Sequence, residues 1–234
     1  HIWKVMNPQA GVLPPRPATA DADPDYETTW FLKESDFLTV YDGPNFGANG
    51  VDGSYEAITG PRPFAVGGVE GIVAGTAITL PPSGSRRTSY YRTTFTTTQP
   101  MSLLAMDVVA DDGLFIYLDG NLVAQKNLDA LTPGFTTLAT NATETEYIAI
   151  DLSQPPGGNV LATVSGLSPG EHTLAVALHQ SSLTSSDVGF GLKLSGIEVT
   201  GQCVLAASAS NVVRSDAGTP GVPGDDTYSF NVTV

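Results

Sequence analysis

The sequence predicts an all-β protein, an antiparallel β-sandwich of the jelly-roll type. The 25 Gly and 17 Pro residues among 234 disfavour helices, and no apolar pattern at helical spacing extends over ten residues. Short runs in which apolar and polar residues alternate recur instead, separated by turn-forming residues. Such runs are typical of β-sandwiches and jelly rolls.

The chain divides into three parts of different composition. Residues 1–27 are rich in Pro, Ala and Asp, which predicts an extended arm without regular structure. The sandwich is expected over residues 28–202, beginning with aromatic and Gly-rich loops. Residues 203–234 are expected to form a linker that ends in one β-strand.

Apolar side chains alternate with polar or small ones in most of the predicted strands. This period of two places the apolar set on one face of a sheet. The expected strands are residues 77–80, 90–97, 102–109, 114–118, 122–124, 147–152, 160–164, 171–179 and 188–199. In the last of them the alternation stops after Leu194 and resumes at Ile197, so we expect a β-bulge at Ser195–Gly196.

The strongest local signal is a β-hairpin around Asp119–Gly120. This pair separates two apolar runs, residues 114–118 and 122–124. A two-residue hairpin turn of the primed type needs positive φ angles, which Gly adopts at little cost. The sequence therefore predicts that these two runs pair directly.

Asp111 and Asp112 form the best candidate metal site. Two adjacent carboxylates repel each other unless a cation or hydrogen-bond donors compensate them. Ca²⁺ takes six to eight oxygen ligands, and Asp187, in the loop after residue 179, could supply a third carboxylate. In the alternative interpretation the two acids only shape a turn, with Gly113 in an unusual backbone conformation.

Aromatic side chains in the loop-rich part form a second candidate site. Trp30, Tyr41, Phe46 and Tyr55 could present a stacking face for a sugar at the rim of the sandwich. Alternatively, they cover the end of the core.

The C-terminal strand is the third feature with a possible function. Its apolar residues are Tyr228, Phe230, Val232 and Val234, and they alternate with polar ones. The backbone of such a strand must pair with another. It could return to its own sheet, open a following domain, or add to a neighbouring subunit.

Charge and motifs exclude several classes of function. The net charge is −14 with only ten Lys and Arg, so clustered cations for nucleic acid are absent and we expect no nucleic-acid partner. No apolar run is long enough to span a bilayer, so we expect no membrane insertion. The single Cys, Cys203, rules out a disulfide within this sequence. Hydrolase, metalloprotease and nucleotide-binding motifs are missing, and we predict a protein that is not an enzyme.

Several segments resemble a galactose-binding-like jelly-roll module of secreted bacterial proteins. They are Tyr90-Tyr-Arg-Thr-Thr-Phe95, the run from Asp111 to Gly120, Ser168 to Gln180, and Ser185 to Leu192. The Asp-Asp-Gly at residues 111–113, followed by Tyr-Leu-Asp-Gly, is also similar to the PA14 family of adhesin and glycosidase modules. In sugar-binding PA14 members the paired Asp motif holds Ca²⁺, which binds sugar hydroxyls. The resemblance covers residues 75–200 and implies this role for Asp111 and Asp112.

Together these observations predict a non-catalytic β-sandwich module of a larger surface or secreted protein. We expect Ca²⁺-supported carbohydrate binding or adhesion, with a glycan or cell-surface polysaccharide as partner. We expect an extracellular or cell-surface location in a bacterium or another prokaryote. The alternative is a structural subunit of a filament, sheath or surface layer. In that case neighbouring copies of the chain would assemble by β-strand addition through the C-terminal strand.

Overall fold

The computed structural model divides the chain into two compact units, residues 1–199 and 200–234. The described residues are 3–6, 30–36, 56–58, 63–66, 75–78, 83–84, 86–129, 134–143, 146–199, 208–215 and 227–233.

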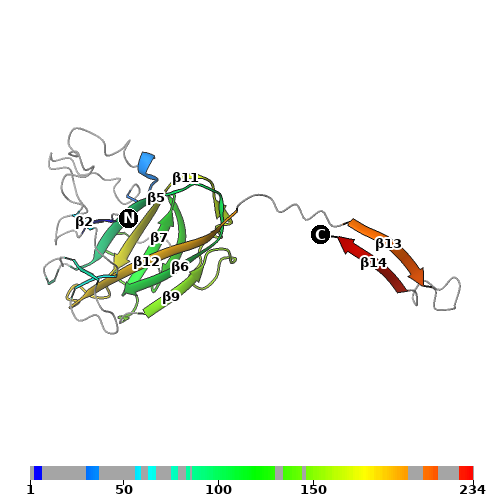
Figure 1. The fold of residues 1–234 in the computed structure, drawn as a ribbon. Coiled ribbons are helices and arrows are strands. Elements are labelled where there is room, and N and C mark those ends of the chain that lie inside the picture. Colours follow the sequence, from blue (N-terminus) through cyan, green and yellow to red (C-terminus); the bar gives the residue numbers. More distant parts are fainter. Residues whose placement is uncertain are drawn as a thin grey trace. The chain divides into compact units, whose positions relative to one another are not determined.

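The larger unit contains two sheets that face each other (Figure 1). The first sheet has the strand order β2-β1-β5-β11-β7-β8, and all its pairs are antiparallel. Its strands are β1 (Trp3–Met6), β2 (Glu56–Ile58), β5 (Thr88–Thr97), β7 (Gly113–Leu118), β8 (Asn121–Lys126) and β11 (Gly170–His179).

The second sheet has the order β10-β6-β12-β3-β4, and β9 also pairs with β6. Its pairs are antiparallel except for the short parallel pair of β3 and β4. Its strands are β3 (Phe64–Val66), β4 (Thr76–Ala77), β6 (Met101–Asp111), β9 (Glu146–Asp151), β10 (Gly166–Leu167) and β12 (Val188–Glu198). The β-sandwich predicted from the sequence is confirmed.

The main core lies between the two sheets and is made by the inward residue of each alternating pair. The first sheet contributes Trp3, Tyr91, Leu114, Ile116, Leu118, Leu174, Val176 and Leu178. The second contributes Phe64, Leu104, Met106, Val108, Ala110, Ile150, Val188, Phe190 and Leu192. Burying one such side chain stabilises the fold by about 1.5–3 kcal/mol, so this alternation determines which face of each strand turns inward.

The first sheet is also buried on its outer face. A second apolar cluster covers it, in which Tyr90, Phe115 and Tyr117 of the sheet meet residues of two connecting segments. The covering residues are Trp30, Leu128, Phe135 and Ala139, with Phe31, Leu32, Leu122 and Leu161 packed against them. Residues 30–36 and 134–139 thus act as a third layer on this sheet.

Two local predictions are confirmed in detail. β12 shifts its register against β6 between Ser195 and Ile197, where the alternation of the sequence slips. β7 and β8 form the expected hairpin, with Leu118 opposite Asn121. Asp119 and Gly120 in its turn have φ angles of 51° and 80°, as a primed turn requires.

The larger unit differs from the expectation at two places. The expected arm contains β1, which pairs with β2 and β5, and Trp3 is only 1% exposed. A strand of four residues is too short for its alternation to stand out in the sequence. The strand expected at residues 160–164 is absent, because the Val160 backbone instead bonds in both directions with Gly157 and forms a tight turn.

The smaller unit contains a two-stranded antiparallel sheet of β13 (Ser208–Ser215) and β14 (Thr227–Thr233). β14 confirms the predicted C-terminal strand. Its partner β13 lies in a stretch where a linker was expected, because that stretch is polar and shows no apolar alternation. Within the described parts of both units, no helix is long and apolar enough to cross a membrane.

Candidate functional site

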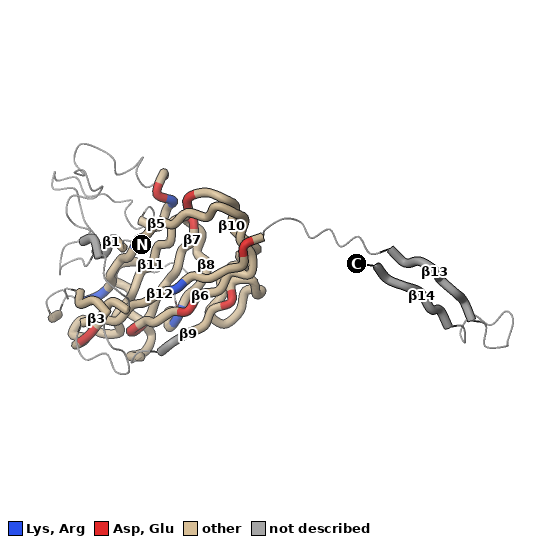
Figure 2. The backbone as a smooth tube through the Cα atoms, in the orientation of Figure 1, with Lys and Arg blue, Asp and Glu red and all other residues tan. Residues whose placement is uncertain are grey.

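Asp111 and Asp112 lie where β6 ends and β7 begins, joined by a cis peptide bond. Both residues are only 3% exposed. Along the described backbone of the sandwich, acidic residues occur at several separate places (Figure 2).

Asp112 connects three segments that are distant in the sequence. One carboxylate oxygen accepts the backbone N–H of Thr143 and the other accepts that of Ser181, both at 2.7 Å. Its carbonyl oxygen accepts the Thr143 hydroxyl at 2.8 Å and the Asn127 side-chain amide at 3.3 Å. These bonds support the interpretation of Asp112 as a residue that organises the loops, whether or not a metal binds.

Gln180, which directly follows β11, contacts Asp111 and was not among the predicted metal ligands. Its side-chain amide nitrogen donates to the Asp111 carbonyl at 2.9 Å, which fixes the orientation of the amide group. Its other polar atom, Oε1, is buried and has no hydrogen-bond partner among the described residues. A buried oxygen without a donor costs about 1–3 kcal/mol, so this atom is a ready ligand for a cation.

Lys126 provides positive charge close to the two acids. The residue is buried, and its ammonium group donates at 3.5 Å to the carbonyl of Ala110, the residue before Asp111. A buried cation at this position offsets part of the cost of burying two carboxylates.

His179 borders the site and is held in one tautomer. Its Nδ1 lies 2.9 Å from the carbonyl of Thr137 and 3.0 Å from the hydroxyl of Thr88, which itself donates to the carbonyl of Phe135. Nδ1 must therefore carry the proton that is donated to Thr137. Burial lowers the pKa of His179 to about 4, partly opposed by the bond to Thr137, so the ring is neutral at pH 7.

Asp187 does not join Asp111 and Asp112 in a three-carboxylate site. Its carboxylate accepts the hydroxyl groups of Ser185 and Ser186, at 3.3 and 3.2 Å, within its own loop. Among the described residues, no group of three or more His, Cys, Asp or Glu side chains is arranged to hold a metal ion. The two carboxylates and the amide oxygen of Gln180 remain as candidate ligands, and oxygen ligands of these types fit Ca²⁺.

The predicted aromatic site is only partly within the described residues. Trp30 is 4% exposed, and its ring centroid lies 4.9 Å from that of Tyr90 and 5.2 Å from that of Tyr117. It is a core residue of the second cluster, because the apolar outer face of the first sheet must be covered. Tyr41, Phe46 and Tyr55 lie outside the described residues.

The predicted assembly residues belong to the smaller unit. Tyr228, Phe230 and Val232 lie in β14, and Val234 lies outside the described residues. The backbone of β14 pairs with β13 of the same chain.

Comparisons with known proteins give weak similarity to a few solved structures. No protein-family model and no curated protein matches the chain. Among solved structures, a PA14 sugar-binding domain from an RTX adhesin is 16% identical with a TM-score of 0.28, and the match covers 48% of each chain. The epithelial adhesin 6 A domain of Candida glabrata, in complex with Galb1-3GlcNAc, is 12% identical with a TM-score of 0.31. That match covers 83% of this chain and 78% of the adhesin domain.

A third similar structure is that of an enzyme. The β-glucosidase of Kluyveromyces marxianus, in complex with glucose, is 6% identical with a TM-score of 0.34. The match covers 84% of this chain but only 16% of the glucosidase. The fold defines the chain as a β-sandwich, and the candidate residues Asp111 and Asp112 lie where its loop ends meet.

Proposed function

We propose that this chain is a non-catalytic module of a larger surface or secreted protein, which binds carbohydrate outside the cell with the help of Ca²⁺. The observation that carries the proposal is the position of Asp111, Asp112 and Gln180 at the junction of three segments. This junction combines two buried carboxylates with a buried amide oxygen that has no partner among the described residues.

Each of the three side chains has a reason to bind a cation. A bound Ca²⁺ would relieve the repulsion between two adjacent carboxylates and supply the missing partner of Gln180 Oε1. The Asp112 oxygens each accept one backbone N–H and keep further lone pairs for a metal. Three protein side chains leave part of a shell of six to eight ligands for other oxygens, such as sugar hydroxyls.

The position of the cluster also suits recognition. Segments from the β8–β9 connection and from the β11–β12 connection meet at Asp112. Connecting loops on a rigid scaffold are where binding residues are concentrated. The same position carries the residues that resemble the PA14 motif, which supports a sugar as the ligand.

Calorimetric titration with Ca²⁺ tests the metal, and a glycan array with Ca²⁺ or chelator tests the sugar. We expect Ca²⁺ at about 100 times its dissociation constant to add about 2.7 kcal/mol to the free energy of unfolding. Asp111→Asn should abolish this gain, and Gln180→Met should weaken Ca²⁺ binding about tenfold or more. Asp107→Asn is the matched control, because that carboxylate is exposed on β6 away from the cluster.

Two results separate the parts of this proposal. If Ca²⁺ neither releases heat nor changes the stability of the wild-type protein, the metal assignment is wrong. If Ca²⁺ binds and no glycan on the array depends on it, the cation is structural and the carbohydrate function is wrong.

One observation favours the assembly function as a second candidate. The smaller unit contains only two described strands, and an isolated two-stranded hairpin is marginally stable in water. A strand from a neighbouring copy, added to β14 beside Tyr228, Phe230 and Val232, would extend this sheet. Sedimentation at increasing concentration should then show assemblies that disappear when residues 200–234 are removed. Monomers at all concentrations would exclude it.

A further inference from the structure

A groove of about 350 Å³ lies beside the turn between β7 and β8. Asp119 and Asn121 line it from the turn and the start of β8, and the segment of residues 162–167, which runs into β10, also lines it. Its apolar lining includes three buried residues, Leu118, Val123 and Leu167. The volume lies within the range of about 300–1,000 Å³ that is typical of small-molecule sites.

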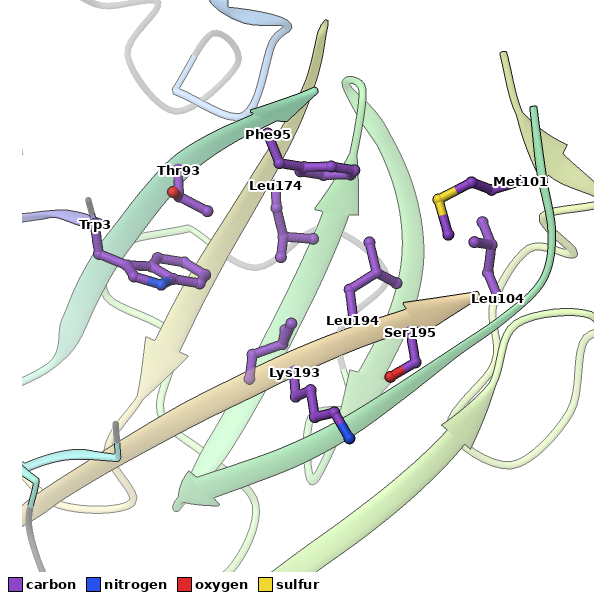
Figure 3. A pocket seen from close by; sticks show the side chains of 10 residues that line it. Trp3, Thr93, Phe95, Met101, Leu104, Leu174, Lys193, Leu194 and Ser195 are labelled. Carbon is purple, nitrogen blue, oxygen red and sulfur yellow. The ribbon is translucent and has the colours of Figure 1, made fainter. Parts of the chain in front are cut away.

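A second cavity differs in the chemistry of its lining. It has a volume of about 160 Å³ and lies between the two sheets, where apolar side chains such as Phe95, Leu104 and Leu174 surround it (Figure 3). Apolar walls alone do not select among small apolar molecules. The groove beside the β7–β8 turn combines apolar and polar groups, so a ligand must match both.

Asp119 supplies the groove with an accessible carboxylate. Its side chain is 14% exposed, and the backbone N–H of Thr173 donates to its Oδ1 at 2.9 Å. Its Oδ2 lies 2.7 Å from Nδ1 of His172 and 3.5 Å from the ammonium of Lys33. Oδ1 thus accepts one donor within the protein and keeps a lone pair for a ligand hydroxyl.

The charges beside the groove favour a neutral ligand. A cationic ligand would meet a carboxylate whose charge is already compensated, and the Lys33 ammonium would repel it. An anionic ligand would lie against the Asp119 carboxylate, and like charges at close range repel. Hydroxyl groups, which both donate and accept hydrogen bonds, meet neither penalty.

Asn121 and Ser165 add exposed polar side chains to the lining. The amide nitrogen of Asn121 donates to the Asp119 carbonyl at 3.2 Å, which leaves its amide oxygen as an acceptor. The Ser165 hydroxyl can donate or accept. A saccharide ring carries hydroxyl groups at its edge and C–H groups on its faces, so it matches polar side chains that lie beside apolar ones.

The walls of the groove are fixed by backbone hydrogen bonds. The Asp119 N–H donates to the Thr173 carbonyl at 2.9 Å, which holds the turn against β11. The Leu161 N–H donates to the Val123 carbonyl at 2.9 Å, so the start of the 162–167 segment is held against β8. A site that is formed before the ligand arrives loses less conformational entropy on binding.

We propose that this groove binds one ring of a neutral saccharide directly, without a metal ion. Asp119 and Asn121 would accept its hydroxyl groups, and Leu118 and Val123 would lie against its C–H groups. The groove is at the opposite end of β7 from Asp112, which corresponds to about 23 Å along an extended strand of seven residues. The ligand class is that of the proposed function, but neither Ca²⁺ nor Asp111 takes part, so the two proposals can fail separately.

The test is an NMR titration of the intact ¹⁵N-labelled protein in the presence of EDTA. The probes are the methyl glycosides of glucose, galactose, mannose and N-acetylglucosamine. We expect saturable binding of at least one of them in the millimolar range. The side-chain amide signal of Asn121 and the backbone signal of Ser165 should shift, whereas that of the Asn127 side chain, which contacts Asp112, should not.

Variants of the lining establish where the glycoside binds. Asn121→Ala removes one acceptor and should weaken binding by about threefold to tenfold. Ser165→Phe fills the groove from an exposed position and should abolish binding, and Ala162→Leu is an independent filling variant. Thr136→Phe is the matched control, because it adds the same side chain at an exposed position outside the groove.

Three outcomes would overturn the proposal. The first is that none of the four glycosides binds saturably in EDTA. The second is binding that persists unchanged in folded Ser165→Phe and Ala162→Leu proteins. The third is a glycoside that binds only with Ca²⁺ and is lost in Asp111→Asn, because that result would place the sugar at the carboxylate pair and support the proposed function instead.

Discussion

His179 should make the sandwich sensitive to acid. Its Nδ1 proton is donated to Thr137, and its Nε2 atom is buried without a partner among the described residues. A proton added at Nε2 would therefore have no acceptor and would place a charge in the interior. Burial lowers the pKa to about 4 from an ordinary 6.5, which means that the folded state binds this proton less readily than the unfolded state.

The size of the effect follows from the two pKa values. Because the pKa is depressed in the folded state, the stability is fully present above pH 6.5 and is lost as the pH falls toward 4. The total loss below pH 4 is about 3 kcal/mol, and between pH 7 and pH 5 it is about 2 kcal/mol. This is a large fraction of the typical stability of a domain.

Urea denaturation at pH 7 and pH 5, in wild-type protein and in His179→Asn, measures this contribution. The Asn amide can donate to Thr137 as Nδ1 does, but it does not titrate. We expect His179→Asn to be less stable than the wild type at pH 7. Between pH 7 and pH 5, the variant should lose about 2 kcal/mol less of its free energy of unfolding than the wild type does. An equal pH dependence of both proteins would refute the reasoning.

Three further substitutions test the hairpin, the third layer and the carboxylate. Gly120→Ala places a residue with a Cβ atom at a φ of 80° and should lower the free energy of unfolding by about 1–2 kcal/mol. Thermal denaturation measures this loss, and an unchanged midpoint would contradict the prediction. Arg92→Met removes the bonds from the guanidinium group to residues 30–36, including that to Glu34 at 2.9 Å. It should lower the free energy of unfolding in urea by about 3–5 kcal/mol. A loss below about 1 kcal/mol would argue against this role of Arg92. Without Ca²⁺, Asp112→Asn should lower the free energy of unfolding by about 2–3 kcal/mol. The control Asp107→Asn, at an exposed carboxylate, should lower it by less than about 0.5 kcal/mol. Equal losses would refute the role of Asp112 in the loops.

The sequence predicted the central strands because the requirement for burial is local. In β11 every second residue from Leu174 is apolar, and in β12 every second residue from Val188 to Leu194 is apolar, so the alternation alone reveals these strands. The bulge at Ser195–Gly196 is equally local, since the slip in the alternation and the shift in register are the same event.

The parts that could not be predicted depend on partners far away in the sequence. β1 is stabilised by pairing with β2 and β5, and only that pairing buries Trp3. Asp112 acts through Thr143 and Ser181, which are 31 and 69 residues away. The pair of Asp residues could be singled out from the sequence, but its donors could not.

β7 has a carboxylate at each end, and comparing the two locates the candidate site. Asp119 accepts the Thr173 N–H at 2.9 Å and contacts the His172 ring nitrogen at 2.7 Å, so donors compensate its charge. Asp112 is equally well supplied with donors, which means that such bonds alone do not indicate a metal. The difference lies in Gln180 Oε1, a buried oxygen beside Asp111 with no donor among the described residues. The case for a cation at the Asp112 end thus depends on this amide more than on the carboxylates, and Gln180→Met is the variant that tests it most directly.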